Sequence, residues 1–146
     1  MSPENVWRLA IALRARGWRW LARCVKNANS FLFHVSLANG AVIGDDLYLG
    51  HHGLGMDVHD NLAIADRVKI WQNVTLTVRA PAGSEHKIII GDDVVVGANA
   101  VVVTPLAASR RIGTGARVGA VVVRDVPDHA TVVGNPARVV RCRAPE

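Results

Sequence analysis

The chain has 146 residues, of which half are hydrophobic and only 5% are aromatic, and it carries a formal net charge of +5. This length suits one domain, and small branched side chains must fill its interior because large aromatic residues are scarce. The positive charge gathers near the two ends of the sequence and no nucleic-acid-binding motif accompanies it, so no nucleic-acid partner is expected. An anionic small molecule or a membrane surface explains such clusters equally well.

The sequence also bears on where the protein resides. Cys24 and Cys142 lack the spacing of metal ligands and are expected to be free thiols. No apolar run approaches the roughly 20 residues that a membrane span needs. Arginines interrupt the N-terminal segment every few residues, unlike the apolar stretch of a signal peptide. A cytoplasmic location is predicted, with peripheral contact to a membrane as an alternative.

Residues 3 to 26 show the periodicity of an amphipathic helix, which we expect to end at Asn27–Asn29. The opposite sides of the predicted helix differ in character. One side is apolar and the other basic, with Val6, Leu9, Ala10, Leu13, Gly17, Trp20, Leu21 and Cys24 against Arg8, Arg16, Arg19, Arg23 and Lys26. Such a helix either packs on the main domain or a neighbouring subunit, or lies on an anionic membrane surface.

From residue 41 onward, an aliphatic residue recurs every six positions and is often followed by glycine. The repeat includes Ile43, Leu49, Ile64, Ile70, Leu76, Ile90, Val96, Val102, Ile112 and Val118. Neither a helix nor an alternating strand has a period of six. The pattern predicts a solenoid in which three short strands close a triangular coil and aliphatic residues stack inside. Glycine suits the corners, where a positive φ or a close approach disfavours other residues.

Three interruptions break the repeat, and long loops on a rigid scaffold often carry function. The first lies between Leu49 and Ile64 and holds a cluster of histidines, the second is a polar loop over residues 77–89, and the third spans Thr104 to Arg111. The expected organisation is a helical lead-in over residues 1–40, a β-helix over residues 41–141 and a tail over residues 142–146.

The repeat and its ending resemble the hexapeptide-repeat acyltransferases, in particular the serine O-acetyltransferases and the short polysaccharide O-acetyltransferases related to them. The resemblance rests on the histidine segment leading to Gln72–Leu76, on Ile90–Ala100, and on Asp125–Arg138. It implies an all-β fold, a left-handed parallel β-helix behind a short N-terminal amphipathic helix. It further implies acetyl-CoA as cosubstrate, no metal, and a homotrimer with active sites between subunits.

The resemblance also implies a histidine general base in the first interruption. An alcohol is a poor nucleophile near neutral pH, and a neutral imidazole can take its proton as it attacks the thioester carbonyl. Counting forward from Ile43 gives His51 as this base, and counting back from Gln72 gives His52. The phase of the coil favours His51, with His52 as the alternative.

The other predicted contacts to the acceptor follow from the same resemblance. In the serine enzymes an aspartate one coil earlier orients the base, whereas residues 34–38 of this chain contain no carboxylate. Asp57 is the nearest substitute, although it can instead pair with His59, which lies on the same side of an extended run. The serine enzymes place a second histidine from the loop near the acceptor, and His86 lies close to that position. His86 and His59 are therefore predicted to contact the acceptor.

Coenzyme A lies along the groove between subunits in the resembling family. By that resemblance, the backbone of Ala98 and Ala120 is predicted to bind its pantetheine arm. Arg138, together with Arg141 or Arg124, is predicted to bind its phosphates, because arginine suits multidentate contact with phosphate.

The sequence therefore predicts an acetyl-CoA-dependent O-acetyltransferase in which a hydroxyl of a small acceptor attacks the thioester directly. The acceptor is serine or a sugar or polysaccharide precursor, and the missing aspartate and short N-terminal region favour the sugar. One alternative is a non-catalytic β-helix that acts as an assembly or membrane-associated scaffold. Another is a gamma-type zinc carbonic anhydrase-like protein, with three ligands drawn from His51, His52, His59 and His86.

Overall fold

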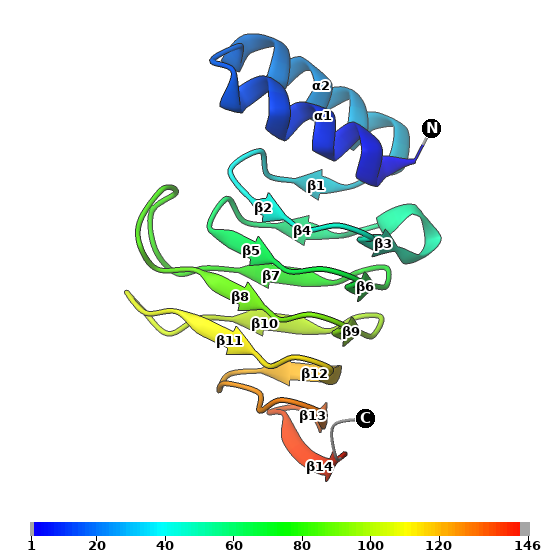
Figure 1. The fold of residues 1–146 in the computed structure, drawn as a ribbon, viewed down its shortest axis with the longest axis vertical. Coiled ribbons are helices and arrows are strands. Elements are labelled where there is room, and N and C mark those ends of the chain that lie inside the picture. Colours follow the sequence, from blue (N-terminus) through cyan, green and yellow to red (C-terminus); the bar gives the residue numbers. More distant parts are fainter. Residues whose placement is uncertain (1, 144–146) are drawn as a thin grey trace.

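The computed structural model describes residues 2–143 and consists of two helices followed by a stack of short strands (Figure 1). The helices are α1 (Pro3–Ala15) and α2 (Arg19–Phe33). The strands form three columns and a C-terminal pair. These are β1 (Ser36–Leu37), β4 (Asp57–Val58), β7 (Thr75–Thr77) and β10 (Val101–Val103); β2 (Val42–Ile43), β5 (Leu62–Ile64), β8 (Ile88–Ile90) and β11 (Arg110–Ile112); β3 (Tyr48–Leu49), β6 (Lys69–Ile70), β9 (Val95–Val96) and β12 (Arg117–Val122); and β13 (Ala130–Gly134) with β14 (Arg138–Cys142).

Each strand of the stack pairs in parallel with the strand three positions later in the chain. Thus β1 pairs with β4, β2 with β5 and β3 with β6, and the same step repeats down the molecule. Three consecutive strands therefore make one turn of a coil, with one strand on each face. The prediction of a parallel β-helix with a six-residue period is confirmed.

The lower end of the stack departs from this rule. Strand β12 is longer than the strands above it and runs around a corner, pairing with β9 through Val118 and with β10 through Val121. Strand β13 then pairs in parallel with β12, and β14 returns antiparallel to β13. This pair closes the C-terminal end of the coil.

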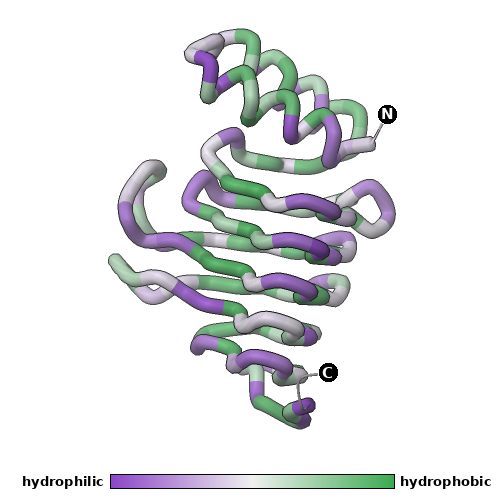
Figure 2. The backbone as a smooth tube through the Cα atoms, viewed as in Figure 1, coloured by the Kyte–Doolittle hydropathy of each residue, from purple (hydrophilic) through white to green (hydrophobic). Residues whose placement is uncertain are grey.

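The inward side chains of successive coils stack into a narrow aliphatic core, and apolar residues alternate with polar ones along the coils in Figure 2. Burial of one such side chain stabilises the fold by about 1.5–3 kcal/mol. The fully buried members are Val68, Ile70, Val74, Leu76, Ile88, Val94, Val96, Val102, Ile112, Ala116, Val122 and Ala130.

The corners of the coil depend on left-handed backbone and on close approach, at different positions. The left-handed residues include Asp46, Arg67 and Asp93, with φ between 52° and 56°, each two residues before a strand of the β3 column. Aspartate tolerates this region better than most residues. Gly91 serves the other need, because a Cβ there would lie 2.8 Å from the backbone nitrogen of Thr114 in the next coil.

The N-terminal segment is helical as predicted, but it forms two helices, and the prediction of one helix ending at Asn27–Asn29 is wrong. Gly17 separates the helices with a φ of 84°, a conformation that glycine adopts at little cost. Helix α2 continues to Phe33, and the buried Asn29 donates from Nδ2 to the carbonyl oxygen of Pro3 at 3.2 Å. The break changes the helical phase, so Trp20 is 73% exposed although it was predicted on the packed side.

The helices cover the N-terminal end of the coil (Figure 1). Helix α1 lies against β3 and α2 against β1, which confirms packing on the main domain. Trp7 of α1 is 1% exposed within the core, and its Nε1 donates to the carbonyl oxygen of Ala38 at 2.9 Å. Within residues 2–143, neither helix has the length and apolar character to span a bilayer.

Replacing Trp7 tests this cap. Trp7→Ala should lower the free energy of unfolding by about 3–5 kcal/mol, because it leaves a cavity and removes the hydrogen bond to Ala38. Trp20→Ala is the matched control and should change stability by less than about 0.5 kcal/mol, since its side chain is mostly exposed. Urea denaturation measures both values. Equal losses in the two variants would contradict the cap.

Candidate active site

The histidine turn, residues Gly50–Gly53 (η1), lies at the corner between β3 and β4. His51 and His52 both adopt left-handed backbone, with φ values of 51° and 57°. Leu49 pairs with Ile70, and Asp57 pairs with Thr75. The corner formed by residues 50–56 is therefore three residues longer than the corresponding corner of the next coil, residues 71–74. Left-handed backbone also occurs at other corners of this coil, as at Asp46, Arg67 and Asp93, so it is the three extra residues that set this corner apart.

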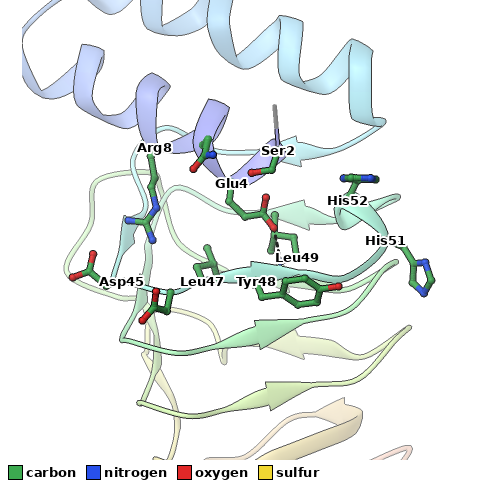
Figure 3. Close-up of a pocket in the computed structure, with 11 residues that line it drawn as sticks. Ser2, Glu4, Arg8, Asp45, Leu47, Tyr48, Leu49, His51 and His52 are labelled. Atoms are coloured by element: carbon green, nitrogen blue, oxygen red, sulfur yellow. Dashed lines mark hydrogen bonds between the residues drawn. The ribbon is translucent and has the colours of Figure 1, made fainter.

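The two imidazoles point in different directions from this turn (Figure 3). His52 lies toward the helices, with its ring 5.8 Å from that of Phe33, while His51 points away from them, with its ring 5.8 Å from that of Trp71. Both side chains are exposed, and neither makes a hydrogen bond to another residue of the described chain. Neither imidazole is therefore occupied by a hydrogen bond within the described chain.

Trp71 forms a platform beneath the histidine turn, which the sequence analysis did not assign to the site. A Cβ on Gly50 would lie 2.5 Å from the indole of Trp71, so the backbone of the turn rests directly on the ring. Tyr48 meets the same indole edge-on, with ring centroids 6.2 Å apart. A signal was present in the sequence, because tryptophan stands here where the repeat usually has glycine.

A cavity of about 1020 Å³ opens beside the histidine turn, between α1 and β3 (Figure 3). Glu4 reaches into its wall from α1 and accepts a hydrogen bond at Oε1 from the backbone nitrogen of Leu49 at 2.7 Å. The sequence analysis missed Glu4. The lining residues are Ser2, Glu4, Asn5, Arg8, Asp45, Asp46, Leu47, Tyr48, Leu49, His51 and His52.

The corner that carries the histidine turn continues down the coil. Leu49, Ile70, Val96 and Val118 pair in succession, and two residues after them come His51, Gln72, Ala98 and Ala120. Three strand spacings of roughly 4.8 Å place Ala120 about 14 Å below the level of His51. Ala98 is exposed and Ala120 is mostly buried. The predicted pantetheine positions thus share a corner with His51.

The predicted phosphate contacts lie at the C-terminal end of the coil. Arg124 and Arg138 line one groove of about 150 Å³, together with Ala137 and Val139. Arg141 is exposed on β14 and does not line this groove. The structure therefore brings together two of the three predicted arginines.

A second group of histidines surrounds the buried Asn61, which the sequence analysis did not single out. The backbone nitrogen of Asn61 donates to Nδ1 of His59 at 3.1 Å, and its side-chain Nδ2 donates to the carbonyl oxygen of His86 at 3.0 Å. Asn61 also bonds Pro81, Gly83 and Ser84, and so fixes the polar loop of residues 78–87 that projects from the stack (Figure 1).

Asp57 lies exposed on the outer side of β4, paired with Ser36 in the coil before and with Thr75 in the coil after. Asp57 therefore lies in the same column as Ser36, in the coil that follows residues 34–38, the segment that lacks a carboxylate. The alternative pairing of Asp57 with His59 is not formed within residues 2–143, and His59 Nδ1 instead accepts a hydrogen bond from the backbone nitrogen of Asn61.

The structure separates the two histidine groups. His51 and His52 precede β4, whereas His59 follows it and lies with His86 at the next corner of the coil. Over the part of the chain that the structure describes, no three His, Cys, Asp or Glu side chains converge as metal ligands do. The four histidines of the zinc alternative thus form two pairs, not one cluster.

Two charged residues beside the strands of the β3 column, Asp93 and Arg117, have shifted pKa values. Arg67 and Asp93 form a two-point ion pair, with Nε–Oδ1 at 2.8 Å and Nη2–Oδ2 at 2.9 Å, which lowers the pKa of Asp93. Burial, and then repulsion from Arg143, lower the pKa of Arg117. Arg67, Asp93 and Arg117 line a groove of about 370 Å³, together with Lys69. The groove is a feature of the same face.

The stacked coils and the histidine turn define a parallel β-helix of hexapeptide repeats. None of the models that describe protein families matches the chain. Curated relatives do: it is 32% identical to a serine acetyltransferase of Helicobacter pylori over 92% of this chain and 77% of the relative. It is also 37% identical to a serine acetyltransferase of Mycobacterium tuberculosis, over 92% of this chain and 58% of the relative.

Solved structures agree. The serine acetyltransferase of Neisseria gonorrhoeae superposes with a TM-score of 0.88 at 32% identity, over 99% of this chain and 55% of that one. Soybean serine acetyltransferase complexed with serine is similar, with a TM-score of 0.83 and 33% identity over 94% of this chain and 56% of that one. A serine acetyltransferase complex with CoA has a TM-score of 0.82 and 28% identity, over 94% of this chain and 55% of that one.

The chain belongs to the serine acetyltransferase family, and its coil is the left-handed parallel β-helix of that family. It spans 58% of the length of the Mycobacterium tuberculosis relative and 62% of that of a Bacillus pumilus relative, to which it is 36% identical over 92% of this chain.

Removing the Asn61 side chain tests how the loop of residues 78–87 is held. Asn61→Ala should raise the rate of amide hydrogen exchange at Gly83 at least tenfold, because the loop loses every bond to the amide. Ser84→Ala, which removes one of these bonds, should change the rate by much less. Exchange measured by NMR checks both, and an unchanged Gly83 rate in Asn61→Ala would show that other contacts hold the loop.

Proposed function

We propose that the chain is an acetyl-CoA-dependent O-acetyltransferase whose acceptor is the hydroxyl of serine. The observation that carries the proposal is the histidine turn, two consecutive strained histidines on an insertion at one corner of the coil. Membership of the serine acetyltransferase family supports it, as do related structures described with serine and with CoA. A cytoplasmic location is part of the proposal.

The proposed reaction is a direct transfer. A histidine of the turn takes the proton of the acceptor hydroxyl while the hydroxyl oxygen attacks the thioester carbonyl. The tetrahedral intermediate collapses, the carbon–sulfur bond breaks, and the departing thiolate takes the proton back from the imidazolium. The products are an O-acetyl ester and coenzyme A with a free thiol.

Both histidines of the turn are candidates for the base. Strand register supports His51, which shares its corner with Ala98 and Ala120. His52 is supported by its ring contact with Phe33, with centroids 5.8 Å apart. We assign Asp57 the role of the orienting carboxylate, because it continues the column of Ser36 on the outer side of the coil.

We propose that the complete site forms between subunits of a homotrimer. Within one chain the two histidine groups lie at different corners, so His59 and His86 can meet the histidine turn only across an interface. Coenzyme A would lie along this interface, with its pantetheine arm at Ala98 and Ala120 and its phosphates near Arg124, Arg138 and Arg141.

A sugar hydroxyl is the second candidate acceptor. The observation that favours it is Ser36, which leaves residues 34–38 without a carboxylate. Asp57 offsets this difference in the same column, so serine remains the first proposal. Contact of the helices with a membrane surface is not part of the proposal, because α1 packs on the coil.

Single alanine variants test the base. His51→Ala or His52→Ala should lower kcat by roughly 100-fold or more, the usual size of general-base effects, with acetyl-CoA binding largely kept. The other variant should retain most activity if its imidazole only shapes the turn. Thiol release with serine measures both. Full activity in both variants would exclude a histidine base from this turn.

Truncating Arg138 tests the coenzyme A site. Arg138→Ala should raise the Kd of acetyl-CoA about tenfold, because charge-assisted hydrogen bonds contribute about 1.5–3 kcal/mol each. Arg23→Ala, at an exposed position of α2, is the matched control for lost positive charge. Titration calorimetry measures the three proteins. Absence of acetyl-CoA binding to the folded wild type would favour the scaffold alternative.

A further inference from the structure

Glu4 belongs to none of the sequence motifs, yet its carboxylate contacts the strand that leads into the histidine turn. Leu49, the last residue of β3, donates from its backbone nitrogen to Glu4 Oε1 at 2.7 Å. A charged acceptor makes such a hydrogen bond stronger than a neutral one. The first turn of α1 is thus bonded to the residue directly before Gly50.

Two other side chains of α1 bond the helix to the same coil. Trp7 Nε1 donates to the carbonyl oxygen of Ala38 at 2.9 Å, and the guanidinium of Arg8 donates to the carbonyl oxygen of Gly44. These contacts hold α1 over the coil independently of Glu4. Removing the Glu4 carboxylate should therefore free the turn without detaching the helix.

The second oxygen of Glu4 is buried and has no hydrogen-bond partner within residues 2–143. A partly unpaired buried carboxylate lowers stability, a loss that an apolar side chain would avoid. Glu4 also lines the same cavity as His51 and His52 (Figure 3). Glu4 thus joins the wall of this cavity to the strand that enters the histidine turn.

We propose that Glu4 is the positioning carboxylate of the histidine turn. It fixes the Leu49 amide, so that the turn presents its two histidines in their strained left-handed conformation. The inference rests on the proposed function and deepens it, because α1 supplies a carboxylate to a site whose preceding coil segment, residues 34–38, has none. Glu4 acts through Leu49 and contacts neither substrate.

Three variants test the role. Glu4→Ala should lower kcat about tenfold or more, with the KM for acetyl-CoA nearly unchanged, because small displacements of a catalytic group reduce turnover strongly. Glu4→Gln should restore most of kcat, since its amide oxygen can accept the same hydrogen bond. Arg14→Ala, which removes another bond from α1 to the coil, the 3.0 Å ion pair with Asp60, should leave kcat unchanged.

Amide hydrogen exchange of Leu49 separates this inference from the proposed activity. Faster exchange in Glu4→Ala, but not in Glu4→Gln, supports the positioning bond even if serine is not acetylated, a result that would count only against the proposed function. The inference would be overturned if Glu4→Ala kept the wild-type kcat or left Leu49 exchange unchanged. It would also be overturned if both Glu4 variants lost kcat equally, or if Glu4→Ala failed to fold.

Discussion

Every coil of this molecule must return to the same three columns of backbone hydrogen bonds. The parallel pairing of each strand with the strand three positions later fixes both the length of a coil and the side chains that point inward. Small branched residues meet this constraint because they stack well in so narrow an interior, where Val68, Ile70 and Leu76 are completely buried. Departures from the period can then occur only at the corners.

The histidine turn is such a departure. Three extra residues leave the pairing of β3 with β6 and of β4 with β7 intact, so the core is unaffected while the corner projects. The strain of two left-handed histidines is borne by surrounding contacts, with Trp71 beneath Gly50 and Glu4 bonded to Leu49. A rigid scaffold that holds a strained, exposed turn is what positioned catalysis requires.

The sequence predicts the coil well because its signal is local and repeated. The aliphatic period and the corner residues indicate the β-helix directly, and the histidine turn is visible as a break in that period. The break at Gly17 was not predicted, because an isolated glycine is also tolerated inside a helix. The bonds from Glu4 to Leu49 and from Asn61 to the projecting loop join residues far apart in sequence, so no periodic pattern reveals them.

The same limit applies to the composition of the site. The family resemblance grouped His51, His52, His59 and His86 in one predicted site, but the triangular coil divides them between two corners. Residues close in sequence are carried to different faces after only a few positions, since each strand from β1 to β11 is two or three residues long. In the proposed homotrimer the two groups would meet across an interface, which the periodic pattern of one chain does not encode.

The release of free thiol from acetyl-CoA by the wild-type chain, with serine and with a panel of sugars, tests the central claim most directly. We expect thiol release that depends on serine and exceeds the rate without an acceptor. A folded protein that binds acetyl-CoA but releases no thiol above that background with serine or any sugar would contradict it.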